Sequence, residues 1–321
     1  MNARSPTVDD PRVSLSPGDL VDRRYRLVAR LGSGGMGEVW SAHHEALGRT
    51  VAIKVVFGVA PEMRARLAAE ARAIAKLSHP AVVAVYDAGA LDDGRPFLVL
   101  ELVVGESLAD RLDREGPPPA IEAVRLLSPV ARALAAAHEV SIVHRDVKPA
   151  NVLLVRGEPP SSAAKLADFG IASSTAPDTS RLTAVGGIVG TPAYMAPEQL
   201  RSQRADGRAD VWGLSVTLFE VVTGNLPFVD DAITALILKV LQDEPVWASV
   251  DAVDEDLGNI LRRGLAKEAD ARYGSATELA EALDAWLAQE SDVAPAPRSS
   301  APTSTKPSAF DALIRAKLPR R

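Results

Sequence analysis

The stretch His144-Arg-Asp-Val-Lys-Pro-Ala-Asn151 is the most informative part of this sequence. It places an acidic, a basic and an amide side chain, those of Asp146, Lys148 and Asn151, at short fixed offsets in one loop. A second polar motif, Asp168-Phe-Gly170, follows in the next segment. A carboxylate that accepts a proton and oxygen atoms that suit Mg²⁺ are parts of a reaction centre. Because two motifs with several fixed residues occur together, the sequence favours such a centre over a solvated charged loop.

Length, composition and charge limit the class of protein. The 321 residues are 47% hydrophobic and 24% charged, a globular composition with enough apolar residues for two lobes. The net charge of −6 argues against a nucleic-acid or membrane-surface binder, which is usually basic. The chain has no cysteine, which excludes disulfides and thiolate metal sites. Residues 1–22 lack the apolar core of a signal peptide and no apolar run reaches ~18 residues, so we expect a cytoplasmic protein without a membrane span.

Short β-branched segments punctuated by glycine dominate the first hundred residues and predict strands. One helical segment interrupts them. Beyond Gly105 apolar residues recur at helical spacing, and Thr277 is a candidate N-cap of the last helix. The expected strands cover residues 25–28, 38–42, 50–56, 82–86 and 96–102, and the expected helices cover residues 62–77, 121–139, 208–223, 232–242, 257–266 and 277–289.

The two ends of the chain differ from its middle. Residues 1–22 contain several Pro, Asp and Ser and predict a flexible lead-in, whereas residues 290–321 are rich in Pro, Ser, Ala and Thr and predict a disordered tail. Four apolar tail residues nevertheless share one helical face, so the tail either stays disordered or docks on the folded part or on a substrate. These are Phe310, Leu313, Ile314 and Leu318, with Arg315, Lys317, Arg320 and Arg321 among them.

The glycine-rich segment Gly32-Ser-Gly-Gly-Met-Gly37 joins two expected strands. Glycines let backbone amides approach phosphate groups closely, because no Cβ intrudes. The same pattern also fits a plain hairpin turn. A dinucleotide-binding fold needs a helix directly after the glycines, but Glu38-Val-Trp40 favours a strand, so that alternative is discounted.

Lys54 ends the apolar segment Val51-Ala-Ile-Lys54. An unpaired ammonium in a core is costly, so we expect either a paired Lys54 or a side chain that extends to the surface. Glu70 in the following helix is the favoured partner, and Glu62 at the start of that helix is a weaker candidate.

Taken in order, these motifs resemble the bacterial Hanks-type, or eukaryotic-like, serine/threonine protein kinases. The resemblance covers residues 24–289. Gly190-Thr-Pro-Ala-Tyr-Met-Ala-Pro-Glu198, Asp210-Val-Trp-Gly-Leu214 and Arg272 complete the match. The implied fold is α+β and two-lobed, like that of the protein kinases. Within a domain over residues 23–289, an N-lobe (23–103) holds an antiparallel sheet plus one helix, and a larger, mainly helical C-lobe (104–289) follows.

Two departures from the family pattern leave every catalytic atom in place. The interval from Asn151 to Asp168, 17 positions, is longer than usual, and we expect the extra residues after Gly157 to widen a hairpin away from the metal. In the expected helix 208–223, Gly213 precedes Ser215, whereas the family commonly has the serine first and the glycine second.

The resemblance implies ATP as phosphate donor and Mg²⁺ or Mn²⁺ as the metal. Asp146 would accept the proton of the acceptor hydroxyl and Lys148 would stabilise the moving charge. Asn151 and Asp168 would bind the metal. The implied nucleotide-binding residues are Leu31, Gly32, Gly34, Gly35, Gly37, Val39, Ala52, Lys54, Glu70, Leu100, Glu101, Val103 and Leu153.

The resemblance also implies regulatory and structural roles. Lys148 and Thr191 indicate serine and threonine, rather than tyrosine, as acceptors. Arg145 would pair with a phosphate on the activation loop, for which Thr183 is the first candidate and Thr179 the second. Further contacts are implied between Glu198 and Arg272, between Asp210 and the catalytic-loop backbone, and among Ile74, His144 and Phe169, which would stack between the lobes.

The predicted function is transfer of the γ-phosphate of ATP to Ser or Thr of proteins, regulated by autophosphorylation of the activation loop. A kinase-like small-molecule phosphotransferase is one alternative, but it would not carry the motif that ends at Glu198. A non-catalytic signalling scaffold is the other, and it would have lost Lys54, Asp146, Asn151 or Asp168. The expected partners are ATP and proteins rather than nucleic acid. The resemblance also suggests a homodimer formed through the N-lobe.

Overall fold

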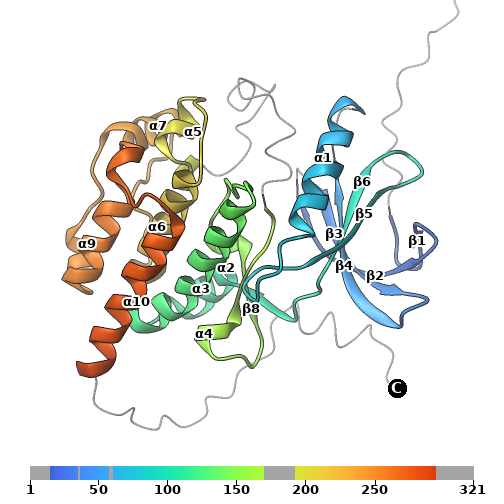
Figure 1. Ribbon diagram of the computed structural model, residues 1–321, viewed down its shortest axis with the longest axis horizontal. Coiled ribbons are helices and arrows are strands. Elements are labelled where there is room, and N and C mark those ends of the chain that lie inside the picture. Colours follow the sequence, from blue (N-terminus) through green and yellow to red (C-terminus); the bar gives the residue numbers. More distant parts are fainter. Residues whose placement is uncertain (1–14, 35–36, 58–60, 170–191, 294–321) are drawn as a thin grey trace, which may run out of the picture.

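The computed structural model describes residues 15–34, 37–57, 61–169 and 192–293. Figure 1 shows two parts side by side, a sheet with one helix and a larger bundle of helices. The predicted two-lobed α+β fold is therefore confirmed.

The first part is an antiparallel sheet with strand order β1-β2-β3-β4-β6-β5. Helix α1 (Pro61–Ile74) packs against it and precedes strand β5 in the chain. The strands are β1 (Leu20–Val21), β2 (Tyr25–Gly34), β3 (Gly37–His44), β4 (Arg49–Val56), β5 (Val85–Ala90) and β6 (Pro96–Leu100).

Two details of this sheet follow from single residues. Gly37 has φ +155, and a Cβ there would lie 2.1 Å from the Val55 carbonyl oxygen, so only glycine allows strands β3 and β4 to approach this closely. Strand β1 pairs with β2, Leu20 opposite Arg26. The sheet thus begins inside the segment that was expected to be a flexible lead-in, and the boundary at residue 22 is corrected to a position before Leu20.

The second part consists of helices around a small three-stranded sheet, β7-β8-β9. Its strands are β7 (Gly105–Ser107), β8 (Val152–Val155) and β9 (Ala164–Leu166). Its helices are α2 (Leu108–Glu115), α3 (Ala120–Glu139), α4 (Pro160–Ala163), α5 (Pro197–Leu200), α6 (Arg208–Thr223), α7 (Ile233–Gln242), α8 (Ala248–Asp251), α9 (Glu255–Gly264) and α10 (Ala276–Val293).

Local sequence signals account for several helix ends. Helix α6 has the predicted bounds and stops at Gly224, which adopts the left-handed conformation (φ 72). Thr277 is not the N-cap of α10, because it lies inside the helix. Instead the Ser275 hydroxyl accepts the Glu278 N–H at 3.2 Å. The extra residues after Gly157 form a turn and helix α4, which packs beside α3, as the longer interval predicted.

The hydrophobic core does not divide at the boundary between the lobes. A smaller cluster, which includes Trp40 and Val99, fills one side of the first sheet. The larger cluster joins Leu67 and Ile74 of α1 to the core of the helical part, where Trp212 is fully buried. Helix α1 thus belongs by packing to both parts. None of the helices in the described ranges combines the length and apolar composition that a membrane span requires.

Candidate active site

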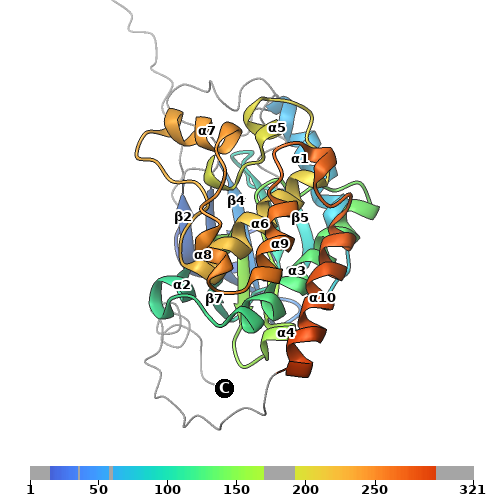
Figure 2. The same ribbon diagram turned by 90° about the vertical axis from the view of Figure 1, so that its left-hand side faces the viewer.

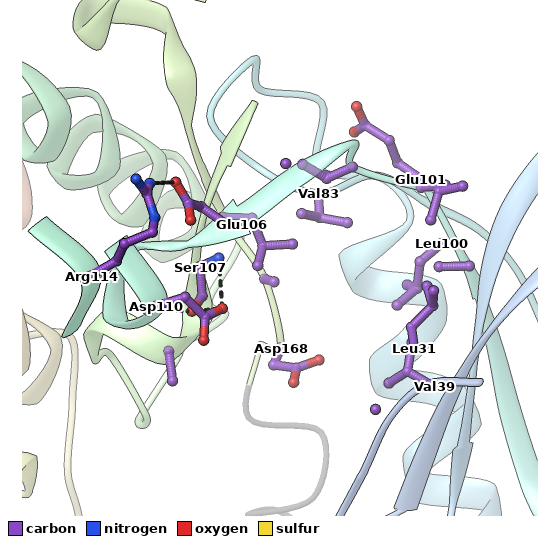
Figure 3. Close-up of a pocket in the computed structure, with 18 residues that line it drawn as sticks. Leu31, Val39, Val83, Leu100, Glu101, Glu106, Ser107, Asp110, Arg114 and Asp168 are labelled. Carbon is purple, nitrogen blue, oxygen red and sulfur yellow. Dashed lines mark hydrogen bonds and ion pairs between the residues drawn. The ribbon is translucent and has the colours of Figure 1, made fainter. Parts of the chain in front are cut away.

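A cavity of about 920 Å³ lies between the two parts (Figure 3). Eight of the predicted nucleotide-binding residues line it, together with the predicted metal ligand Asp168. The eight are Leu31, Gly32, Val39, Ala52, Leu100, Glu101, Val103 and Leu153. Mostly apolar walls with a few polar groups are typical of a pocket for a small organic ligand.

The catalytic-loop side chains hold one another in place. Lys148 Nζ lies 3.0 Å from Asp146 Oδ1 and 2.8 Å from Oδ2. Asn151 Nδ2 donates to the Asp146 carbonyl at 2.7 Å and to Asp146 Oδ2 at 3.0 Å. The Asp146 side chain remains 30% exposed, so the oriented carboxylate stays accessible to another molecule.

Asp210, from helix α6, fixes the backbone that precedes Asp146. Its buried carboxylate accepts the His144 N–H at 2.8 Å and the Arg145 N–H at 2.6 Å. His138 Nε2 lies 2.7 Å from the same carboxylate. Arg145 adopts φ 67, which is unfavourable for a residue with a side chain, and these bonds stabilise it. The predicted contact of Asp210 with the catalytic loop is present.

Lys54 pairs with Asp168 across the cavity, with Nζ 2.7 Å from Oδ1. The Lys54 side chain is mostly buried, so the prediction of a paired rather than a surface lysine is confirmed. Its partner here is Asp168, whereas Glu70 was expected. Glu70 lies half-buried on α1, and a pair between it and Lys54 stays a prediction.

The two motifs are also connected to each other. The Ala167 N–H donates to the Asn151 carbonyl at 2.8 Å, and His144 Nε2 lies 2.9 Å from the Ala167 carbonyl. The rings of His144 and Phe169 are 4.7 Å apart. Asp168 itself has φ 59 and follows this anchored backbone. These contacts fix the carboxylate of Asp168 relative to Asn151.

The segment between the lobes presents backbone to the cavity. Glu101 directs its carboxylate to Lys165, 2.9 Å away, and its N–H donates to the Ala84 carbonyl at 2.8 Å. Figure 3 shows this side chain pointing away from the cavity. The segment therefore meets the cavity through Glu101, Leu102 and Val103, with the Glu101 carboxylate turned to Lys165.

The sequence analysis missed one end of the cavity, where helix α2 begins. Ser107 and Asp110 form a capping box, in which the Asp110 N–H donates to Ser107 Oγ at 3.0 Å. Arg114 pairs with Glu106 on the same side (Figure 3). The Ser-x-x-Asp pattern before Leu108 was the signal that could have identified this helix. The cavity is also lined by Val83, Leu102, Gly105, Ala150 and Ala167.

Below the catalytic loop, Glu198 and Arg272 make the predicted ion pair. Both Arg272 Nη1 and Nη2 lie 2.8 Å from the carboxylate, and the Arg272 side chain has no exposed surface. Nearby, the Tyr194 hydroxyl donates to Glu220 Oε2 at 2.6 Å, and burial raises the pKa of Glu220. These pairs attach the segment after residue 191 to helix α6 and to Arg272, which lies just before α10 in the chain.

Several predicted site residues do not line the cavity or cannot be placed. The described nucleotide-site residues that do not line it are Gly34, Gly37, Lys54 and Glu70, and the catalytic-loop residues Asp146, Lys148 and Asn151 do not line it either. Gly35, Thr179, Thr183 and Thr191 lie outside the described residues.

Comparisons with known proteins agree with this architecture. Residues 25–284 match the protein kinase domain family. The chain is 38% identical over 291 residues to serine/threonine-protein kinase PknL of Mycobacterium tuberculosis, covering 88% of this chain and 71% of PknL. It is 40% identical over 286 residues to Pkn1 of Myxococcus xanthus, covering 87% and 40%, and 36% identical over 272 residues to PknB of Mycobacterium leprae, covering 82% and 43%.

The chain thus spans about two fifths of the length of several curated relatives. Among solved structures, the crystal structure of Rad53 1-466 in complex with AMP-PNP is similar, with a TM-score of 0.69 at 22% identity, covering 82% of this chain and 65% of the other. That likeness concerns the fold.

Proposed function

The chain belongs to the protein kinase domain family, and we propose that it transfers the γ-phosphate of ATP to serine and threonine hydroxyls of proteins. The observation that carries the proposal is the mutual arrangement of Asp146, Lys148 and Asn151, in the same loop as Ala150 and Leu153, which line the cavity. The curated relatives named above are all serine/threonine-protein kinases by name.

In the proposed reaction Asp146 orients the acceptor hydroxyl and accepts its proton. Asn151 and Lys148 both contact the Asp146 carboxylate, so its direction is set before any substrate arrives. The Lys148 ammonium lies close enough to stabilise the negative charge that moves with the phosphoryl group. Phosphoryl transfer requires mainly positioning and charge neutralisation, and one placed carboxylate is sufficient for it.

The cavity explains where the nucleotide would bind. Val39 and Ala52 on one side and Leu153 on the other form two apolar walls for the adenine ring. Leu102 and Val103 offer backbone groups between these walls. Lys54 lies beside Asp168 and would bind the phosphates, with Glu70 holding it in place.

Mg²⁺ or Mn²⁺ fits the donor set at the inner end of the cavity. Asn151 has an amide oxygen and Asp168 a carboxylate, both hard oxygen donors. Among the described residues no group of three His, Cys, Asp or Glu could hold a metal ion without a ligand. Mg²⁺ generally uses one or two protein oxygens together with phosphate oxygens and water. Bound there, the ion would neutralise charge on the phosphates.

We further propose regulation through the loop before residue 192. The Arg145 carbonyl accepts a bond from Gln199 Nε2 at 3.1 Å, which fixes the backbone beside the catalytic aspartate. The Arg145 guanidinium would pair with a phosphate on Thr183, or on Thr179 as the second choice. Thr191 would contact Asp146 and Lys148. An N-lobe homodimer and a cytoplasmic location complete the proposal.

Labelled ATP tests the central claim. Wild-type protein should label itself and an added protein acceptor on Ser and Thr, whereas Asp146→Asn should lower the rate by about 10²–10⁴-fold. Thermal unfolding of both proteins should coincide, because the Asp146 side chain is partly exposed. Equal labelling by the Asp146→Asn variant would show that the base is assigned wrongly. Label only on small hydroxyl compounds would favour the small-molecule phosphotransferase.

A further inference from the structure

Helix α7 is apolar around most of its circumference but poorly covered. Seven of its ten residues, Ile-Thr-Ala-Leu-Ile-Leu-Lys-Val-Leu-Gln, are apolar, yet only Val240 is buried. A helix that is apolar on all sides is expected to lie inside a protein. Leu236, Ile237 and Leu241 pack half-buried against the core, which accounts for one side only.

Large apolar side chains on α7 and on the residues that flank it in the chain are exposed to water. We define the α7 surface as Val229, Ile233, Leu238 and Val246, which are 60%, 53%, 54% and 69% exposed. Lys239 Nζ donates to the Val229 carbonyl at 2.8 Å, so the segment before the helix is attached to it. Four large apolar side chains exposed within 18 residues of sequence indicate a docking site.

The surroundings of this surface are acidic. Residues 229–247 hold four acidic side chains, those of Asp230, Asp231, Asp243 and Glu244, against Lys239, which gives a net charge of −3. Asp231, Asp243 and Glu244 are exposed. A partner for the α7 surface should therefore combine apolar anchors with positive charge.

The C-terminal segment of the same chain has this combination. Residues 294–321 contain six basic residues and one acidic residue, a net charge of +5. Since the whole chain carries −6, residues 1–293 carry −11. Phe310, Leu313, Ile314 and Leu318 recur at the spacing of one helical face. The charge of the chain is thus strongly asymmetric, and the basic end holds the apolar repeat.

The length of chain allows the contact. Sixteen residues separate Val293, the end of α10, from Phe310. An extended chain of that length spans about 53–58 Å. Helix α10 has 18 residues and is therefore about 27 Å long. In Figure 2, α7 lies toward the end of the helical part where α10 begins, whereas the tail starts at the opposite end of α10. To reach α7, the tail has to run back along about the length of α10 and then pass across the helical part.

We propose that Phe310–Leu318 docks on the α7 surface of the same chain, with its apolar residues against Ile233 and Leu238 and its basic residues beside the acidic rim. The inference concerns binding within the chain and goes beyond the proposed phosphoryl transfer. It explains both the exposed apolar residues of the α7 surface and the basic residues of the C-terminal segment by one contact.

Paired cysteines test the contact directly, because the chain contains no cysteine of its own. The full chain with Leu238→Cys and Leu313→Cys is treated with a short bismaleimide, and the linked peptide is quantified by mass spectrometry. The matched control combines Leu313→Cys with Val140→Cys, whose position is 52% exposed, close to the 54% of Leu238. We expect the α7 pair to link at least about tenfold faster than the control pair, through its higher effective concentration.

Four further outcomes decide the proposal. High salt should reduce the difference between the pairs, because it screens the charges. Equal linking of the two pairs would overturn the proposal. Linking mainly between a Leu238→Cys chain and a separate Leu313→Cys chain would replace it with contact to a second copy. If Leu313→Asp abolishes binding to phosphatidylserine vesicles while the α7 pair does not link, the tail binds membranes instead.

Hydrogen exchange of the full chain gives a second measurement without new cysteines. Leu313→Asp combined with Ile314→Asp should increase exchange of the α7 amides and leave the amides of α3 unchanged. The same exchange of α7 in the variant and the wild type would contradict the docked segment.

Discussion

At the scale of single residues, the candidate site depends on charged groups that are held away from water. Asp210 and Arg272 are buried, and each bonds to backbone groups as well as to a side chain. Arg272 Nε donates to the Ala266 carbonyl at 2.8 Å, beside its pair with Glu198. A buried charge is tolerated only with such partners, so the loss of one partner is costly.

Glu198→Ala should therefore destabilise the protein strongly. Removing the carboxylate leaves the Arg272 guanidinium buried without its counter-charge, which typically costs about 3–5 kcal/mol of the free energy of unfolding. Urea titration of both proteins measures the difference. The pair Arg263–Glu278, at 3.2 Å and about half exposed, provides the control. Glu278→Ala should change stability by less than about 1 kcal/mol. Equal effects of the two variants would contradict the role of burial.

Lys267 should make stability depend on pH. Burial lowers its pKa from 10.5 to about 8, although the Val240 carbonyl at 2.8 Å and the Phe228 ring at 4.0 Å favour the charged form. At pH values between about 8 and 10.5, Lys267 is protonated to a greater extent in the unfolded chain than in the folded chain. The free energy of unfolding contributed by Lys267 therefore rises as the pH rises from about 8 to 10.5.

The comparison of wild type with Lys267→Met measures this contribution. Denaturant titrations between pH 7 and 10.5 should show a smaller pH-dependent rise for the variant. Lys76→Met, at an exposed position after α1, is the control and should follow the wild type. Parallel curves for the wild type and Lys267→Met would contradict the lowered pKa.

At the scale of elements, the exchanged Gly213 and Ser215 are explained by what helix α6 packs against. Gly213 faces the catalytic loop, where an added Cβ would lie 3.2 Å from Val147 Cβ. Ser215 faces helix α9, where Gly264 provides the space, and its hydroxyl donates to the Val211 carbonyl at 2.8 Å. The serine thus fits because α9 has a glycine opposite.

Gly264→Ala should separate α6 from α9. The new Cβ would lie 2.0 Å from Ser215 Oγ and 2.9 Å from Ser215 Cβ, so a buried side chain must shift. Overpacking of this kind costs about 1–3 kcal/mol of the free energy of unfolding. Ser215→Gly in the same chain should recover most of the loss, as a double-mutant cycle measures. If the two changes are additive, the helices do not meet through this pair.

At the scale of the whole molecule, the larger of the two core clusters extends through helix α1 into both parts, and the cavity lies between the parts. Ile74 of α1 and Leu134 of α3 belong to the same buried cluster. The cavity is lined from both sides, by Val39 of the sheet and by Leu153 of the helical part. A ligand in the cavity therefore contacts both parts and should stabilise the molecule as a unit.

AMP-PNP with Mg²⁺ should raise the melting temperature. A ligand at a hundred times its Kd adds about 2.7 kcal/mol to the free energy of unfolding, which corresponds to a rise of at least about 5 °C for a chain of this size. EDTA should remove much of the rise, and Asp168→Asn should show a smaller rise with or without EDTA. Asp92→Asn, on the exposed β5–β6 turn, should behave like the wild type. If neither EDTA nor Asp168→Asn reduced the rise in melting temperature, the metal assignment would be contradicted.

The sequence by itself determined the class of fold, most helices and the composition of the catalytic loop. These features are local: helical spacing marks residues 121–139, glycines mark turns, and Asp146, Lys148 and Asn151 lie within six residues. The family resemblance supplied the contacts of Asp210 and Arg272. Strand β1 was missed because it has only two residues, and helix α2 because it has only eight, although its Ser-x-x-Asp start was a readable signal.

Only the tertiary structure decided how distant residues meet. It placed Val83 and Arg114 at the cavity, paired Lys54 with Asp168, and left one side of α7 uncovered. The sequence determines periodicity and loop chemistry because neighbours along the chain set them. Such long-range contacts depend instead on how every helix and strand packs at once, which no local pattern contains.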